Sequence, residues 1–114
     1  MEYNLSLLKK LSGNDEQFIV DMLVTFKKTS PPIVERMQQY MNEKKYIALG
    51  KEAHKLIPGV SFLGASQLKD ELVKIEEGMK LDAIPQDLNQ CVINVKKFVE
   101  ELIQQFETDF NLGD

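Results

Sequence analysis

The sequence predicts an all-α fold, namely an antiparallel up-down four-helix bundle with a short extra N-terminal helix. Three observations lead to this prediction. No stretch alternates apolar and polar residues for long, as a half-buried β-strand would. Apolar residues instead recur three or four positions apart along most of the chain. Residues typical of helix starts and ends separate these stretches at short intervals, so we expect short connections.

The N-terminal part of the chain is expected to form a short helix followed by a longer one. Residues 5–11 make one or two helical turns that end at Ser12-Gly13. Asn14 is the expected cap of the next helix, because Gln17 follows three residues later as in a capping box. Apolar residues at helical spacing carry this helix to about Thr29.

Two adjacent prolines indicate the start of a further helix. Ser30 is a suitable cap before Pro31 and Pro32. Prolines are tolerated in a first helical turn because its N–H groups have no partner within the helix. This helix is expected to end near Asn42.

Three more helices complete the expected fold. They cover about residues 45–63, 66–79 and 85–106, with Gly64 setting a tight turn between the first two. Residues 107–114 are polar and are expected to fray. We expect one domain over residues 1–114, with its core at about residues 10–107 and the opening segment as a lid.

Composition and charge argue against several classes of function. The net charge of −4 comes without a concentrated basic cluster, which argues against nucleic acid as a partner. No glycine-rich phosphate loop is present, so a nucleotide-binding enzyme is not expected. Cys91 is the only cysteine, which rules out an internal disulfide and, beside a single histidine, makes a poor metal site.

The sequence gives no indication of a membrane partner. No apolar run approaches the roughly 20 residues needed to span a bilayer. The first residues also lack the basic-then-apolar layout of a signal peptide. We therefore expect a cytoplasmic, free-standing protein that begins at Met1 and is a monomer.

His54 is the only histidine of the chain. At about 100° per residue it lies about 120° from the centre of the apolar stripe of its helix, so its imidazole is expected on the side of the bundle. It is either a solvated surface histidine or part of a docking site. Docking is favoured because its neighbours are small or apolar, although glycine and proline cost about 1 and 3 kcal/mol relative to alanine inside a helix. The expected docking surface consists of Ile47, Gly50, Pro58, Gly59, Ser61 and Phe62, the last of which could instead pack under the following turn.

The stretch AHKLIPGVSFLGASQLKDELVKIE, residues 53–76, resembles the signature of histidine phosphotransfer (HPt) domains. That signature commonly reads His-x-Leu-Lys-Gly, followed by small residues and then Leu-Gly. The resemblance extends over residues 10–107. The matching positions are His54, Leu56, Leu63, Gly64, Leu68, Leu72 and Glu76.

The resemblance implies a phosphoryl carrier without kinase activity of its own. His54 would accept a phosphoryl group from an aspartate of one response-regulator receiver domain and pass it to another. Imidazole suits this step because it is nucleophilic and largely neutral at cellular pH. The implied partners are receiver domains and a hybrid histidine kinase. This chain would bind no cofactor, and Mg²⁺ would sit on the receiver.

Two positions depart from the family pattern. Ile57 stands where the family has lysine, and Pro58 stands where it has glycine. Pro58 cannot donate to the carbonyl of His54 and its ring crowds that carbonyl, so we expect a kink or widened turn there. Lys51 or Lys55 could supply the missing cation beside the phosphoryl group, or both could be ordinary solvated lysines.

Two other functions stay open at this point. The chain could be a degenerate HPt-like bundle that binds receivers or kinases without phosphotransfer, which Ile57 favours. It could also be an unrelated helical adaptor or small hydrolase in which the motif is a coincidence. Glu76 is one of several carboxylates expected at helix starts or on solvated faces, and Lys80 is expected to be ordinary surface charge.

Overall fold

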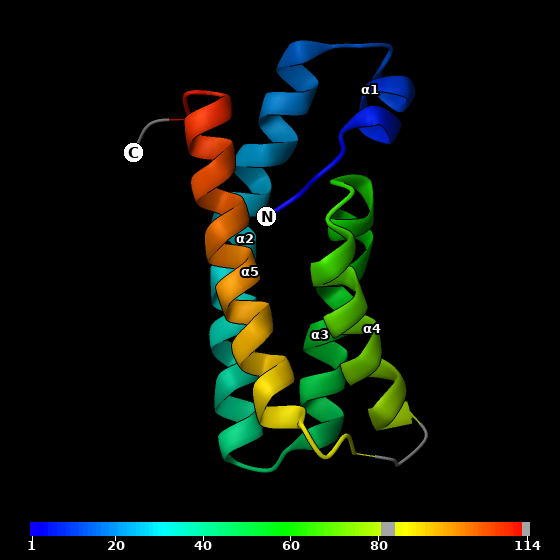
Figure 1. Ribbon diagram of the computed structural model, residues 1–114, viewed down its shortest axis with the longest axis vertical. Coiled ribbons are helices and arrows are strands. Elements are labelled where there is room, and N and C mark those ends of the chain that lie inside the picture. Colours follow the sequence, from blue (N-terminus) through cyan, green and yellow to red (C-terminus); the bar gives the residue numbers. More distant parts are fainter. Residues whose placement is uncertain (81–83, 113–114) are drawn as a thin grey trace.

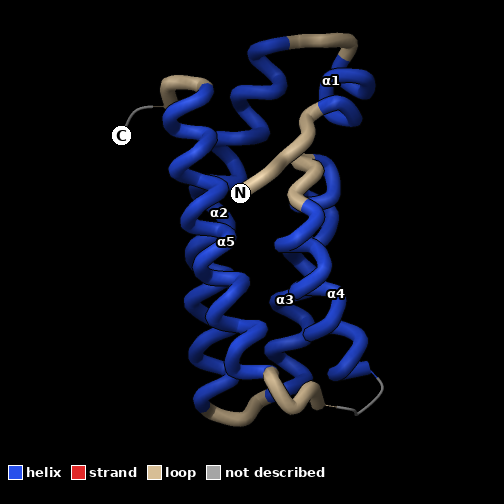
Figure 2. Tube along the Cα trace, in the orientation of Figure 1, coloured by secondary structure: helices blue, strands red, loops and turns tan. Residues whose placement is uncertain are grey.

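The described part of the protein is helical apart from its connections. The computed structural model describes residues 1–80 and 84–112, which contain five α-helices and no β-strand (Figures 1 and 2). The helices are α1 (Ser6–Ser12), α2 (Glu16–Asn42), α3 (Tyr46–Phe62), α4 (Ser66–Lys80) and α5 (Leu88–Asp109).

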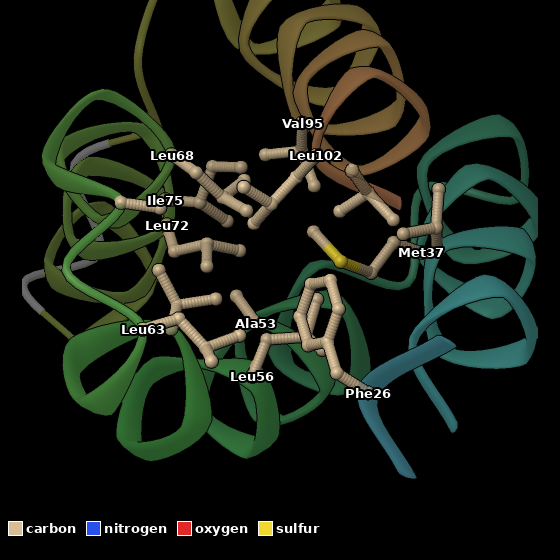
Figure 3. Packing of buried hydrophobic residues seen from close by; sticks show 14 of the residues in the cluster. Phe26, Met37, Ala53, Leu56, Leu63, Leu68, Leu72, Ile75, Val95 and Leu102 are labelled. Atoms are coloured by element: carbon tan, nitrogen blue, oxygen red, sulfur yellow. The ribbon is translucent and has the colours of Figure 1, made fainter. Parts of the chain in front are cut away.

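The four longer helices lie along the long axis of the molecule (Figure 1). α2 packs against α3 and α5, and α4 packs against the same two helices. Because each helix buries its apolar stripe against two neighbours, side chains from all four meet in one hydrophobic cluster (Figure 3). The largest fully buried side chains include Leu23, Met37, Leu49, Leu72 and Phe106.

α1 lies at one end of the molecule, near the turn between α3 and α4 (Figure 1). Leu8 anchors it in the core with 2% of its surface exposed. The N–H of Asn4 donates to the carbonyl of Leu63 over 3.0 Å. Gly64 has a φ of +64°, and a Cβ there would lie 2.3 Å from the Asn4 carbonyl oxygen. The tight turn predicted at Gly64 is therefore confirmed, and only glycine fits it.

The prediction of two helices over residues 14–42 is wrong, because α2 continues through Pro31 and Pro32. Its buried residues keep one helical phase across the prolines. They are Ile19, Leu23, Phe26, Ser30, Val34 and Met37. The buried hydroxyl of Ser30 donates to the carbonyl of Phe26 over 2.6 Å, so the only polar group in this stripe is satisfied. Burial along the whole stripe outweighs the roughly 3 kcal/mol that each proline costs inside a helix.

The cap of α2 is Asp15 and not Asn14 as predicted. The Asp15 carboxylate accepts a hydrogen bond from the N–H of Phe18 over 3.1 Å. Asn14 instead has a φ of +64° in the turn after α1. Asparagine tolerates this left-handed conformation better than most residues, which explains its place in the turn.

α5 also differs from the prediction at both ends. It begins at Leu88 and not at Pro85, because a turn comes first in which the Pro85 carbonyl accepts from the Leu88 N–H over 3.1 Å. The fraying predicted from residue 107 is wrong for residues 107–112. The ring of Phe110 meets that of Phe106 edge-on at 6.5 Å, and Leu112 packs against the core. Residues 113 and 114 lie outside the described part of the chain.

Candidate functional site

His54 lies in the middle of α3, and its side chain is 67% exposed. The apolar stripe of the helix turns the other way, toward the core, and it contains Leu49, Ala53, Leu56 and Val60. The exposed position expected from the helical wheel is therefore observed. α3 stays helical past Pro58 to Phe62, so the imidazole sits on a continuous, well-packed helix.

The imidazole contacts one acidic side chain on the neighbouring helix. Nδ1 of His54 contacts Oε2 of Glu76, whose side chain is only 15% exposed. An ionised carboxylate accepts hydrogen bonds but donates none, so Nδ1 carries the proton in this contact. When the ring is neutral, Nε2 is then the nitrogen with a free lone pair. The arrangement presents one nucleophilic nitrogen on an exposed face of the molecule.

The expectation that Glu76 lies on a solvated face is thus wrong. α3 and α4 run in opposite directions from the turn at Gly64, so residues at similar distances from the turn face each other. His54 meets Glu76 in this register, and Gly50 meets Met79 one helical turn further from Gly64. His54 is 10 residues before Gly64 and Glu76 is 12 residues after it, so counting equally outward from the turn would have paired His54 with Lys74 instead.

Lys80 lies one turn after Glu76 on α4. Its ammonium is 3.6 Å from Oε1 of Glu76, while the other oxygen of the same carboxylate contacts His54. The lysine side chain is 68% exposed. A cation therefore shares a carboxylate with the imidazole, although the sequence suggested only ordinary surface charge at Lys80.

Lys55 is held in a different network, on the side of α3 that faces α2. Its ammonium is 2.8 Å from Oε2 of Glu52, and Nε of Arg36 contacts the other oxygen of that carboxylate. Burial of Glu52 raises the pKa of its carboxyl, but the hydrogen bonds and charges of Lys55 and Arg36 outweigh it, so the pKa is lowered on balance. The Glu52 carboxylate thus remains ionised and keeps Lys55 beside it.

Lys51 lies one helical turn before Lys55 on α3 and has no ion pair with any residue in the described ranges. It lines a groove beside two exposed isoleucines, Ile47 and Ile84. The residues lining the groove are Lys44, Lys45, Tyr46, Ile47, Ala48, Lys51, Met79 and Ile84. Within the described part of the chain, no ion pair or side-chain hydrogen bond joins Lys51 to His54 or Glu76.

Most residues of the predicted docking surface are accessible. Ile47 is 74% exposed, Phe62 is 36% exposed and Pro58 is also exposed. A Cβ at Gly59 would meet no atom within 4 Å, so the surface is open there, although Gly59 lies toward α2, in a pocket that Lys55 and Phe26 also line. Ser61 is only partly buried, but its hydroxyl donates to the carbonyl of Ile57 over 2.8 Å.

Gly50 does not belong to this surface, contrary to the prediction. It is buried, and a Cβ at this position would lie 2.8 Å from both Cβ and Cγ of Met79. The glycine allows α4 to approach α3 closely. A gap in side-chain volume on a helix marks a contact with a neighbouring helix as readily as a docking site.

The described residues include no group of three or more His, Cys, Asp or Glu side chains placed to hold a metal ion. Among them, no helix is both long enough and apolar enough to cross a membrane. Comparison of the chain with protein-family models, curated proteins and solved structures finds no match.

Proposed function

We propose that this protein is a histidine phosphotransfer protein of a two-component phosphorelay, with the antiparallel up-down four-helix bundle typical of that family. The observation that carries the proposal is the contact between Glu76 and the largely exposed imidazole of His54. The motif around His54 suggests the family. The contact adds a physical reason why Nε2 of this ring is the reactive atom.

The proposed reaction needs few groups from this chain. Nε2 of His54 attacks the phosphorus of a receiver's aspartyl phosphate, so the P–Nε2 bond forms while the P–O bond to the aspartate breaks. The aspartate leaves as a carboxylate, and the ring becomes a phosphorylated imidazolium. Glu76 accepts the Nδ1–H hydrogen bond throughout, which favours the ring's positive charge as it develops. Attack by a second receiver's aspartate reverses these steps, and Mg²⁺ on the receivers would balance the phosphoryl charge.

The open surface beside the imidazole fits a visiting domain. Phosphoryl transfer requires the two partners to be in line and close, so bulky side chains around Nε2 would block it. Gly59 and Pro58 offer no long side chain, and Ile47 and Phe62 supply exposed apolar area. Together they suit a receiver domain that covers His54 during transfer.

Incubation with a phosphorylated receiver domain tests the proposal directly. The protein should take up an acid-labile, alkali-stable label, and His54→Gln should remove it completely because the chain has no other histidine. If no receiver domain of the source organism labels the protein, the proposal is refuted. Binding of a receiver without any transfer would instead favour the degenerate bundle, which the isoleucine at position 57 also suggests.

Glu76→Ala should slow transfer without abolishing it. We expect a loss of about three- to tenfold, because charge-assisted hydrogen bonds contribute roughly 1.5–3 kcal/mol and solvent weakens this one at a ring that is largely exposed. Glu77→Gln is the matched control, since Glu77 is exposed and forms no ion pair within the described residues. The transfer rates are measured by rapid quench. Equal rates for Glu76→Ala and Glu77→Gln would contradict the role of Glu76.

A further inference from the structure

The position that carries a lysine in the HPt pattern cannot supply a cation in this chain. Ile57 stands there, and it packs partly buried against the core. A phosphoryl group on a side chain brings about 1.5 to 2 negative charges at neutral pH. On His54 this charge would form beside the carboxylate of Glu76, so a nearby cation is needed to offset the repulsion.

We propose that Lys80, and not Lys51 or Lys55, is the cation that stabilises the phosphoryl group on His54. The inference rests on the proposed function and names a further residue for it. Lys80 is the only one of the three lysines that shares a carboxylate with the imidazole. Lys55 is held by Glu52 on the α2 side, and Lys51 forms no ion pair or hydrogen bond with His54 or Glu76 among the described residues.

The geometry also lets Lys80 exchange partners. Its 3.6 Å contact with Glu76 is long for an ion pair, and the side chain is 68% exposed, so little holds it in place. When Nε2 gains a phosphoryl group, the ammonium moves from Glu76 to the phosphoryl oxygens. Glu76 continues to accept the hydrogen bond from Nδ1–H of His54, and Lys80 balances the new negative charge. The lysine of the family pattern is thus replaced by one from the neighbouring helix.

Chemical phosphorylation tests this without any receiver domain. With phosphoramidate, Nε2 of His54 attacks phosphorus, the P–Nε2 bond forms, and the bond to the reagent's nitrogen breaks, releasing ammonia. The ring keeps its Nδ1 proton, and the protons of the released ammonia come from the protonated nitrogen of the reagent. Phosphorus NMR follows the phosphohistidine signal, which belongs to His54 because the chain has one histidine. His54→Gln should give no such signal.

Lys80→Gln should lower the initial rate of phosphorylation about two- to fivefold at low ionic strength, the range of an exposed ion pair. The difference from wild type should shrink at about 1 M salt, where the screening length is roughly 3 Å, and Lys80→Arg should restore most of the rate. Lys69→Gln is the control, since this lysine is exposed on the same helix and has no ion pair within the described residues.

A rate for Lys80→Gln equal to that of wild type at low salt overturns the assignment. So does a slowing that salt leaves unchanged, or one that Lys69→Gln shares. Failure of the proposed function gives a different pattern, in which no receiver exchanges phosphoryl groups with the protein while the chemical reaction still depends on Lys80.

Discussion

Two glycines in α3 should respond in opposite ways to the same substitution. Neither has a positive φ, so alanine suits the backbone at both positions. At Gly50 the new methyl group would lie 2.8 Å from Cβ and Cγ of Met79, whereas at Gly59 it would meet nothing within 4 Å. Because Cβ of Met79 is fixed to the α4 backbone, a rotamer change cannot relieve the contact at Gly50 and the helices must move apart.

The expected magnitudes follow from two opposing terms. Alanine is favoured over glycine inside a helix by about 0.8–1.0 kcal/mol, so Gly59→Ala should raise the free energy of unfolding by roughly 0.5–1 kcal/mol. At Gly50 the overpacking costs about 1–3 kcal/mol. Because the helix preference of alanine offsets about 1 kcal/mol of this cost, Gly50→Ala should lower the free energy of unfolding by roughly 0–2 kcal/mol. The two variants should therefore differ by about 1–3 kcal/mol.

Urea unfolding followed by far-ultraviolet circular dichroism measures both free energies. The slopes of the transitions should be alike, since each variant exposes the same surface on unfolding. If Gly50→Ala proves as stable as Gly59→Ala, the close approach of α4 at position 50 is wrong.

Two further substitutions test other parts of the structure. Pro32→Ala should raise the free energy of unfolding by about 1–3 kcal/mol, because it removes a proline from the interior of α2; at the start of a separate helix the same change would give no gain. Glu52→Gln should make the free energy of unfolding fall less steeply than in wild type as the pH is lowered. The lowered pKa of Glu52 stabilises the fold above the ordinary carboxyl pKa, and this contribution is lost as pH falls through the folded value. Urea midpoints compared between pH 7 and about pH 3 would show it, and a variant as acid-sensitive as wild type would contradict the role of Arg36 and Lys55.

The helices themselves could be predicted because their apolar spacing is regular. The exposed position of His54 followed from the same spacing, since a stripe that faces the core fixes the direction of every other side chain on that helix. α2 shows where local signals fail. Prolines and a serine cap suggested a break at residues 30–32, but the buried stripe keeps its phase from Leu23 to Met37. Comparing the phase on both sides of the prolines would have indicated one helix.

Contacts between helices could not be predicted from the sequence by treating each helix separately. Glu76 is 22 residues from His54, and its role depends on the register of α3 against α4. The same register places Met79 over Gly50. Both features had signals in the sequence, a carboxylate at the edge of an apolar stripe and a glycine inside a helix. Each signal had a second interpretation that only the packing of the two helices could decide.

That register links the packing of Gly50 to the chemistry proposed for His54. The absence of a side chain at residue 50 brings α4 close to α3 one turn away from the contact between His54 and Glu76. Gly50→Ala should therefore weaken this contact, although Gly50 is buried and has no side chain to take part in it. Nitrogen-15 NMR of the imidazole reports which ring nitrogen carries the proton. We expect the proton on Nδ1 in wild type and in Gly59→Ala, and a mixture of the two tautomers in Gly50→Ala. An unchanged tautomer in a destabilised Gly50→Ala would mean that Glu76 follows the imidazole when α4 moves, so the spacing of the helices would not control the nucleophile.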